Sequence, residues 1–138
     1  MSNKIVKDAG VHHIALKVRD YDLSLKFYAE GLGFEQLLEW GEGNSRICLM
    51  DIGDGVCLEL FAGGAESQPT GAFIHLAIRT SDTDSAYAAA LAAGAKPDKP
   101  PFEARLCGRQ YTQPARIAFV IGPDGESLEF FCPREIER

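Results

Sequence analysis

The chain has 138 residues, a hydrophobic fraction of 46% and a formal net charge of −6. This length suits one domain with a single core or two small coupled cores. The negative charge argues against nucleic acid or an anionic membrane as the main partner, and no apolar run approaches the roughly 20 residues of a membrane span. A small molecule remains a suitable partner, even an anionic one, because a local pair of cations is enough to bind it.

The N-terminal stretch MSNKIVKDAG lacks the apolar segment of a signal peptide, so we expect a cytoplasmic location. The four cysteines show no CxxC spacing and are expected to be reduced thiols. They are Cys48, Cys57, Cys107 and Cys132.

The first half of the chain reads as strand–helix–strand–strand–strand. Residues 11–18 alternate as a strand with one apolar and one polar face, and Asp20 is placed to cap a helix over 21–31. Turn-forming sequences then separate three further strands, at residues 34–40, 46–51 and 56–61.

Residues 62–72, AGGAESQPTGA, predict a small, flexible connection, after which the same order repeats. The second half has a strand over 73–80, a helix from Asp82 to about Ala93, and strands over 117–121 and 127–132. Between them, a Pro-rich passage (97–101) precedes an insertion (102–116) that is read as loop or strand, bordering the site rather than building the core. The sequence therefore predicts an α+β fold, with one domain over 1–138 made of βαβββ modules 11–61 and 73–132 and linker 62–72.

The two halves also repeat their polar residues. The segments HIALK (13–17) and HLAIR (75–79) correspond, as do IGDGVCLELF (52–61) and IGPDGESLEFF (121–131). Strand alternation places one His and one Glu of each half on the face away from the helix. These residues are His13, Glu59, His75 and Glu129. If two such sheets curve toward each other, two imidazoles and two carboxylates converge, and such a set without thiolate suits Zn, Ni, Co, Mn or Fe(II).

Taken singly, these residues and their neighbours allow other interpretations. A His or Glu that stands alone on a strand is more often structural or solvated, and His12 is interpreted in this way. Lys17 and Arg79 are equivalent in the repeat, and they either bind a substrate anion or are two solvated cations. Cys57 is not expected to be a nucleophile, because no His lies near it in sequence and nothing indicates a lowered pKa.

The chain resembles the vicinal oxygen chelate superfamily, which includes glyoxalase I, extradiol dioxygenases, methylmalonyl-CoA epimerase, and fosfomycin- and bleomycin-resistance proteins. The stretches HHIALKVRDYDLSLKFYAEGLGF and RIAFVIGPDGESLEFF carry the resemblance most specifically. It implies two βαβββ modules that form a metal-holding cleft, with one divalent ion per site held by His13, Glu59, His75 and Glu129. Two His and two Glu is the pattern of glyoxalase I, whereas the epimerase usually has Gln at the first Glu position.

By this resemblance we expect a lactoylglutathione lyase-like enzyme that isomerises a thiol hemithioacetal of a 2-oxoaldehyde. The ion would stabilise an enediolate, and Glu129 (first choice) or Glu59 would move the proton. The alternatives are an epimerase, an Fe(II) extradiol dioxygenase, or a non-catalytic protein that binds a drug or another small molecule. The resemblance also suggests a homodimer, with the cleft built either within one chain or between two.

The pattern departs from bacterial glyoxalase I at two positions. An Arg that usually holds a glutathione carboxylate is replaced by Lys17, and a common Asn is replaced by Gly63. Lys can attract a carboxylate but lacks the bidentate fork of Arg. The residues expected to line the substrate cleft are Lys17, Arg79, Phe61 and Phe131.

Overall fold

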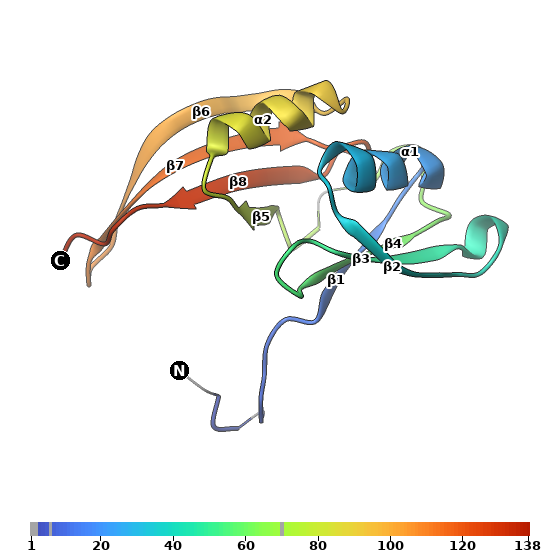
Figure 1. Ribbon diagram of the computed structural model, residues 1–138, viewed down its shortest axis with the longest axis horizontal. Coiled ribbons are helices and arrows are strands. Elements are labelled where there is room, and N and C mark those ends of the chain that lie inside the picture. The colour runs from blue at the N-terminus through green and yellow to red at the C-terminus, as the bar shows by residue number, and fades with distance from the viewer. Residues whose placement is uncertain (1–2, 6, 70) are drawn as a thin grey trace.

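The computed structural model describes residues 3–5, 7–69 and 71–138, so that residues 1, 2 and 6 of the N-terminal stretch and residue 70 of the predicted linker lie outside it. Two four-stranded sheets, each with a helix, make up the fold (Figure 1). The elements are β1 (His13–Lys17), α1 (Tyr21–Lys26), the π-helical turn η1 (Phe27–Gly31), β2 (Glu35–Trp40), the 3-10 turn η2 (Gly43–Ser45), β3 (Ile47–Asp51), β4 (Cys57–Phe61), β5 (Leu76–Arg79), α2 (Thr83–Ala92), β6 (Lys96–Cys107), β7 (Thr112–Ile121) and β8 (Ser127–Pro133). The predicted α+β fold of two βαβββ modules is confirmed.

In each module, the strand order brings the strand of the histidine predicted to bind metal next to the strand of the predicted glutamate ligand. The sheets have the orders β1-β4-β3-β2 and β5-β8-β7-β6. The pairs β1–β4 and β5–β8 are parallel, and the other pairs are antiparallel. Parallel neighbours need a long crossover connection, which the helix and two strands provide here. The first and last strands of a module therefore lie side by side although they are far apart in sequence.

Both helices begin at the aspartates that the sequence indicates. The side chain of Asp20 accepts the backbone N–H of Leu23 at 3.1 Å, and that of Asp82 accepts the N–H of Ser85 at 3.1 Å. These bonds satisfy N–H groups that lack a partner inside the helix. The predicted helix over 21–31 is confirmed, and its last turn is π-helical rather than α-helical.

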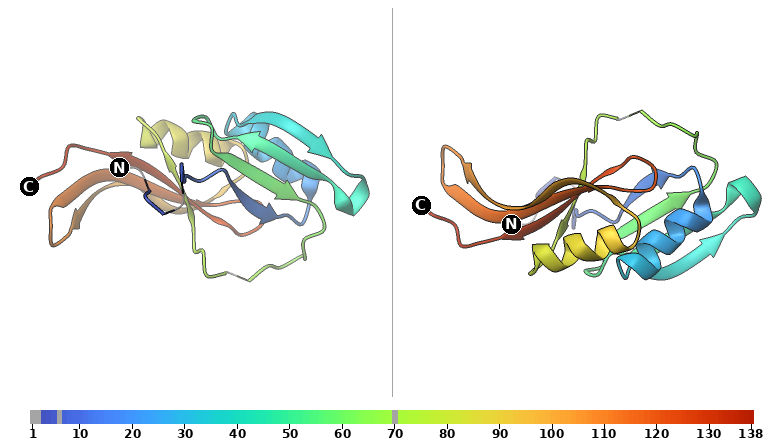
Figure 2. Two further views of the ribbon diagram at one scale, coloured as in Figure 1. Left: turned by 90° about the horizontal axis from the view of Figure 1, so that it is seen from below. Right: turned by 90° about the horizontal axis from the view of Figure 1, so that it is seen from above.

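One hydrophobic core serves both modules. It lies between the helices and the sheet faces that they cover, and the helical segments of the two modules meet near their ends in Figure 1 and Figure 2. The helical segments approach each other so closely that a Cβ built on Gly31 would clash with the Cβ of Ala93. The fully buried core side chains include Tyr28, Met50, Leu58, Leu60, Val120 and Leu128. The modules of one chain are thus joined on their helical side.

The prediction for the Pro-rich passage and the insertion was wrong in part. Residues 97–101 belong to the long strand β6, and residues 112–116 belong to β7, so the insertion lengthens a β-hairpin of the second sheet. Prolines are tolerated because β6 is an edge strand and its register shifts on either side of Lys99. The insertion also contributes to the core, since Ala115 is fully buried.

A polar cluster on the β7–β8 turn fixes the second module to α1 of the first. The backbone N–H of Arg19 and the hydroxyl of Ser24 donate to the two carboxylate oxygens of Asp124, at 2.5 and 2.9 Å. The hydroxyl of Tyr28 donates to Oε2 of Glu126 at 2.7 Å. We call these five residues the inter-module clamp. Ser24 and Tyr28 are fully buried, so the clamp is part of the core boundary.

The corresponding turn of the first module makes a looser contact. Asp54, which matches Asp124 in the repeat, forms an ion pair with Arg79 of the second module at 3.5 Å, and both side chains are exposed. The two contacts follow the pseudo-symmetry of the repeat, because each turn reaches the segment where the first strand of the other module ends.

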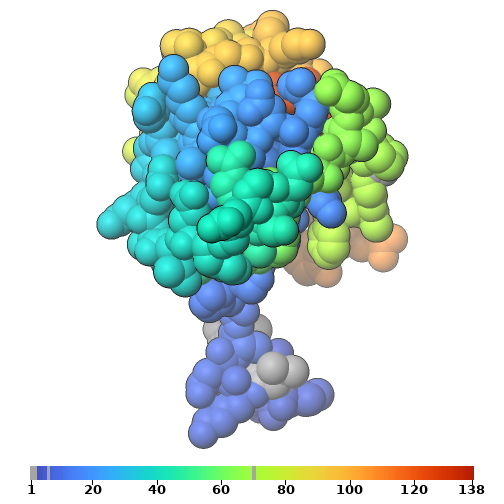
Figure 3. All heavy atoms as spheres, turned by 90° about the vertical axis from the view of Figure 1, so that its right-hand side faces the viewer, coloured from blue at the N-terminus to red at the C-terminus, as the bar shows by residue number. Residues whose placement is uncertain are grey.

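The face of the first module seen in Figure 3 is formed by α1, β2, η2 and the start of the connection to β5. The described residues that precede β1 extend away from the two sheets in Figures 1 and 3. Within the residues described, no helix is long and apolar enough to cross a membrane.

Candidate metal centre

His13 and Glu59 form a pair on adjacent strands of the first module. In the parallel register of β1 and β4, His13 lies opposite Cys57, and Ala15 lies opposite Glu59. Alternation sends Leu58 and Leu60 into the core and Glu59 to the opposite face. Nε2 of His13 lies 3.6 Å from Oε1 of Glu59, with side-chain exposures of 42% and 13%. We call this pair the first half-site.

A second imidazole contacts this pair. Nδ1 of His12 lies 2.9 Å from Nδ1 of His13, within hydrogen-bonding distance, and the two rings meet edge to face with centroids 5.2 Å apart. From the sequence, His12 was interpreted as a structural or solvated residue that stands alone on its strand. The only sign of this contact in the sequence is that His12 and His13 are adjacent. That sign is weak, because adjacent residues of a strand ordinarily point to opposite faces.

His75 and Glu129 form the corresponding pair in the second module. His75 immediately precedes β5, and Glu129 lies on β8 opposite Ala77 of β5. Glu129 has a relative exposure of 9%, lower than a carboxylate usually has. Burial raises the pKa of Glu129 above its ordinary value, and the nearby His75 partly offsets this shift. We call this pair the second half-site.

Two residues beside the second half-site were not singled out from the sequence. The ring of Phe119 meets the ring of His75 edge to face at a centroid distance of 5.7 Å, and Phe119 lies opposite Glu129 in the β7–β8 register. The ammonium group of Lys99 lies over the ring of Phe119, 5.2 Å from its centroid. Strand alternation places Phe119 on this face, whereas Lys99 lies in the Pro-rich passage that gave no such signal.

The half-sites fit a divalent ion in ligand chemistry. Neutral imidazole and carboxylate bind Zn²⁺ and similar ions at about 2.0–2.2 Å, so two ligand atoms on one ion lie about 3–3.5 Å apart. The 3.6 Å between Nε2 of His13 and Oε1 of Glu59 is close to this separation. Among the described residues of a single chain, however, no three His, Cys, Asp or Glu side chains gather closely enough to hold one ion. One chain therefore brings each predicted pair together but does not bring the two pairs together.

The four residues expected to line the substrate cleft form two equivalent pairs of neighbours, one in each module. Lys17 lies opposite Phe61 in the β1–β4 register, and Arg79 lies opposite Phe131 in the β5–β8 register. Each half-site thus has a cation beside an aromatic ring at the end of its parallel strands. Arg79 is 73% exposed in its ion pair with the turn of the first module.

The position that lacks the common Asn is next to Lys17. A Cβ built on Gly63 would lie 3.9 Å from Cε of Lys17, and Gly63 has a φ of +87°, which favours glycine. The two departures from the glyoxalase I pattern are therefore neighbours in space.

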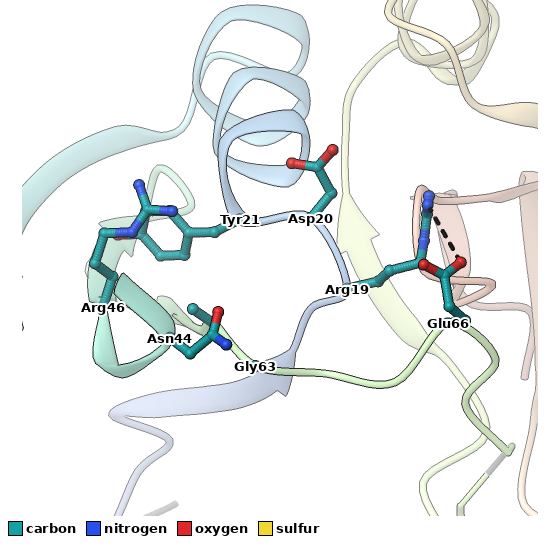
Figure 4. A pocket seen from close by; sticks show the side chains of 8 residues that line it. Arg19, Asp20, Tyr21, Asn44, Arg46, Gly63 and Glu66 are labelled. Carbon is teal, nitrogen blue, oxygen red and sulfur yellow. Dashed lines mark ion pairs between the residues drawn. The ribbon is translucent and has the colours of Figure 1, made fainter. Parts of the chain in front are cut away.

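A polar pocket of about 270 Å³ lies near this end of the first module, at the junction of β1, α1 and η2 (Figure 4). Its lining residues are Arg19, Asp20, Tyr21, Asn44, Arg46, Ala62, Gly63 and Glu66. Its two arginines already have carboxylate partners, since Arg46 contacts Asp22 at 3.0 Å and Arg19 contacts Glu66 at 4.0 Å. The four predicted metal ligands are not among the lining residues, so this pocket is separate from both half-sites.

The cysteines near the first half-site are not activated. Cys48 and Cys57 are free and buried, and burial raises the pKa of both thiols. A raised pKa disfavours the thiolate, which is the nucleophilic form. This agrees with the expectation that Cys57 is not a nucleophile.

Comparison with known proteins identifies the family. The profile of the Glyoxalase/Bleomycin resistance protein/Dioxygenase superfamily matches residues 10–130. A sequence search of curated proteins finds no match. The chain belongs to this superfamily, which agrees with the resemblance drawn from its motifs.

Among solved structures, both enzymes and binding proteins have the same fold as this chain. The protein SMU.1112c is 26% identical, with a TM-score of 0.71, and the match covers 91% of this chain and 99% of that one. The trypanothione-dependent glyoxalase I of Leishmania major is 25% identical, with a TM-score of 0.68 and coverage of 91% and 87%. The antibiotic-binding protein TnmS3 from Streptomyces sp. CB03234 is 23% identical, with a TM-score of 0.67 and coverage of 91% and 97%, and it shows the fold alone.

Proposed function

We propose that this protein is a metal-dependent isomerase of the glyoxalase I type, acting on the hemithioacetal formed by a thiol and a 2-oxoaldehyde. The observation that carries the proposal is the recurrence of one His beside one Glu at equivalent places in both modules. Similarity to the glyoxalase I of Leishmania major supports the same reading. A cytoplasmic location, where the four thiols would stay reduced, is part of the proposal.

The proposed metal ligands are His13, Glu59, His75 and Glu129. A divalent ion (Ni, Zn, Co, Mn or Fe) bound by them would supply Lewis-acid stabilisation of negative charge on the substrate oxygens. Two imidazoles and two carboxylates would leave room for a substrate with two adjacent oxygen atoms, which matches a hemithioacetal.

Glu129 is our first choice for moving the proton between the neighbouring carbon atoms, and Glu59 is the second. A general base works best when its pKa lies near the working pH, and burial raises the pKa of Glu129 in that direction. Lys17 and Arg79 would attract an anionic part of the thiol, with Phe61 and Phe131 packing against its apolar parts.

We propose further that a homodimer builds each complete site from two chains. The modules of one chain are joined at their helices and by the inter-module clamp. Each chain then offers a first half-site and a second half-site separately, and a second copy can supply the missing pair. Exchange of equivalent modules between identical protomers is a low-cost route to a dimer.

The test is metal analysis of the purified protein together with a methylglyoxal assay with several thiols, including glutathione and trypanothione. We expect one divalent ion per pair of modules. We also expect enzymatic consumption of the hemithioacetal, and a chelator should abolish this activity and added metal restore it. Oxygen consumption with an aromatic diol instead would indicate a dioxygenase. Tight binding of a small molecule without turnover or bound metal would indicate a binding protein.

A further inference from the structure

We propose that His12 is a positioning residue for His13. In this arrangement Nδ1 of His12 accepts the proton on Nδ1 of His13, which leaves Nε2 of His13 unprotonated and facing the side of Glu59. The inference rests on the proposed function, because it concerns how one proposed metal ligand is prepared for an ion.

The contact between the two imidazoles is well formed. The Nδ1–Nδ1 distance of 2.9 Å lies in the usual range for a hydrogen bond, and the ring planes are 86° apart. The backbone of His12 is also anchored, since its carbonyl oxygen accepts the N–H of Cys57 at 2.9 Å. An exposed side chain is thus held in place at the start of the β1–β4 pair.

The chemistry of the pair sets the direction of the proton. A neutral imidazole has one donor and one acceptor nitrogen, and a metal-binding histidine needs a free lone pair on the nitrogen that faces the ion. Nε2 of His13 makes no hydrogen bond with Glu59, because their 3.6 Å separation is longer than a hydrogen bond. With the proton on Nδ1 and donated to His12, the lone pair of Nε2 faces the carboxylate, and a cation between them satisfies both.

The second half-site shows that the repeat does not demand this arrangement. The residue before His75 is Ile74, which cannot accept a proton, and the ring of His75 contacts Phe119 instead. Within the described part of the chain, a second imidazole as hydrogen-bond partner of the histidine is therefore particular to the first module. Such partners outside the ligand shell fix the tautomer of metal-binding histidines, and their loss typically weakens metal binding about 10–100-fold.

The experiment measures the affinity of the full-length, metal-free protein for Zn²⁺ by competition with a chelator. His12→Leu removes the acceptor at similar size and should weaken Zn²⁺ binding about tenfold or more. His12→Asn keeps an acceptor near the position of Nδ1 and should restore affinity close to that of the wild type. Ile74→Ala, at the equivalent position of the second module, is the matched control and should leave affinity unchanged.

Nitrogen NMR of the imidazoles provides a readout independent of activity, and with three histidines in the chain the spectrum is simple. In the metal-free protein, at a pH where the rings are neutral, His13 should carry its proton on Nδ1, and in His12→Leu on Nε2. An unchanged tautomer and unchanged Zn²⁺ affinity in His12→Leu would overturn the positioning role and leave the proposed function standing. Failure of the wild type to bind Zn²⁺, Ni²⁺, Co²⁺, Mn²⁺ and Fe²⁺ alike would overturn the proposed function, and this inference with it.

Discussion

The first and second half-sites carry the same two residue types at equivalent strand positions but hold them differently. In the first, His13 is partly exposed and its ring contacts another imidazole, that of His12. In the second, Glu129 is buried and His75 contacts the aromatic ring of Phe119. Both histidines are exposed, and the difference lies in what each contacts: a second imidazole in the first half-site and an aromatic ring in the second.

Under the proposed function, this difference would give different chemistry to two glutamates that the repeat makes equivalent. Burial disfavours the charged form of a carboxyl group, so the pKa of Glu129 is raised. The carboxylate of Glu59 faces Nε2 of His13 at 3.6 Å, in the manner of a ligand pair. Duplication supplies two similar half-sites, and under the proposed function their surroundings would make Glu129 the group that moves the proton and Glu59 mainly a ligand.

The largest expected effect comes from exchanging the two glutamates for glutamine. Glu129→Gln should lower kcat by roughly 10²–10⁴, the usual contribution of a positioned general base. Glu59→Gln should lower it less. Thermal unfolding of both variants should stay near that of the wild type, because Gln is of similar size and removes a buried charge at position 129. A larger loss of kcat in Glu59→Gln would reverse the assignment.

The two Asp-Gly turns give the next largest difference, in stability. Asp124→Ala removes the acceptor for Ser24 and Arg19 and leaves the buried Ser24 hydroxyl without its partner, so the free energy of unfolding should fall by about 2–4 kcal/mol. Asp54→Ala is the matched control and should cost about 1 kcal/mol or less, since its ion pair with Arg79 is exposed. Denaturant unfolding measures both, and equal losses would contradict the asymmetry of the two turns.

The cations at the ends of the parallel strands should show a smaller, kinetic effect. Lys17→Ala and Arg79→Ala should each raise KM by about tenfold with the true substrate and change kcat little, because they bind the substrate and the transition state alike. Steady-state kinetics at several salt concentrations checks this. If neither variant changes KM, the two residues are solvated strand cations.

The smallest effect concerns the pH dependence of the inter-module clamp. Burial raises the pKa of Glu126 in the folded protein, although its bond from Tyr28 works in the opposite direction. The folded state then holds more protons on Glu126 than the unfolded state does. The stabilising contribution of Glu126 is therefore full below its unfolded pKa of about 4.3 and is lost as pH rises through the folded pKa.

Comparison of the wild type with Glu126→Gln isolates this group, because the other titrating residues are common to both proteins. The stability of the wild type relative to Glu126→Gln should decline as pH rises through that window and then level off. A relative stability that increases with pH would mean that the bonds to the ionised carboxylate outweigh its burial.

Much of the fold was predictable because the signals are local and repeated. Strand alternation around Glu59 and Glu129, and the caps Asp20 and Asp82, depend on neighbouring residues and were read correctly. The Pro-rich passage was not, because whether proline is tolerated in a strand depends on that strand lying at the edge of a sheet. Edge position is a property of the assembled sheet and leaves no mark in the sequence of β6 itself.

The candidate site was predictable only as two separate pairs. The register of parallel strands follows from the repeat, so the partnership of each His with its Glu could be expected. The contact of His12 with His13 depends on side-chain rotation, and the inter-module clamp depends on how two modules pack through their helices. These features involve contacts between elements distant in sequence, such as Ser24 with Asp124, which local patterns do not specify.

The most direct test of the account mixes two variants, His13→Ala and His75→Ala, which are unfolded and refolded together. If each site takes its first half-site from one chain and its second from the other, a mixed dimer contains one intact site and one doubly damaged site. Random pairing of equal amounts should then restore roughly a quarter of wild-type metal content and isomerase activity. If activity in the mixture stays at the level of the separately refolded variants, each chain builds its own site or none, and the shared metal centre is contradicted.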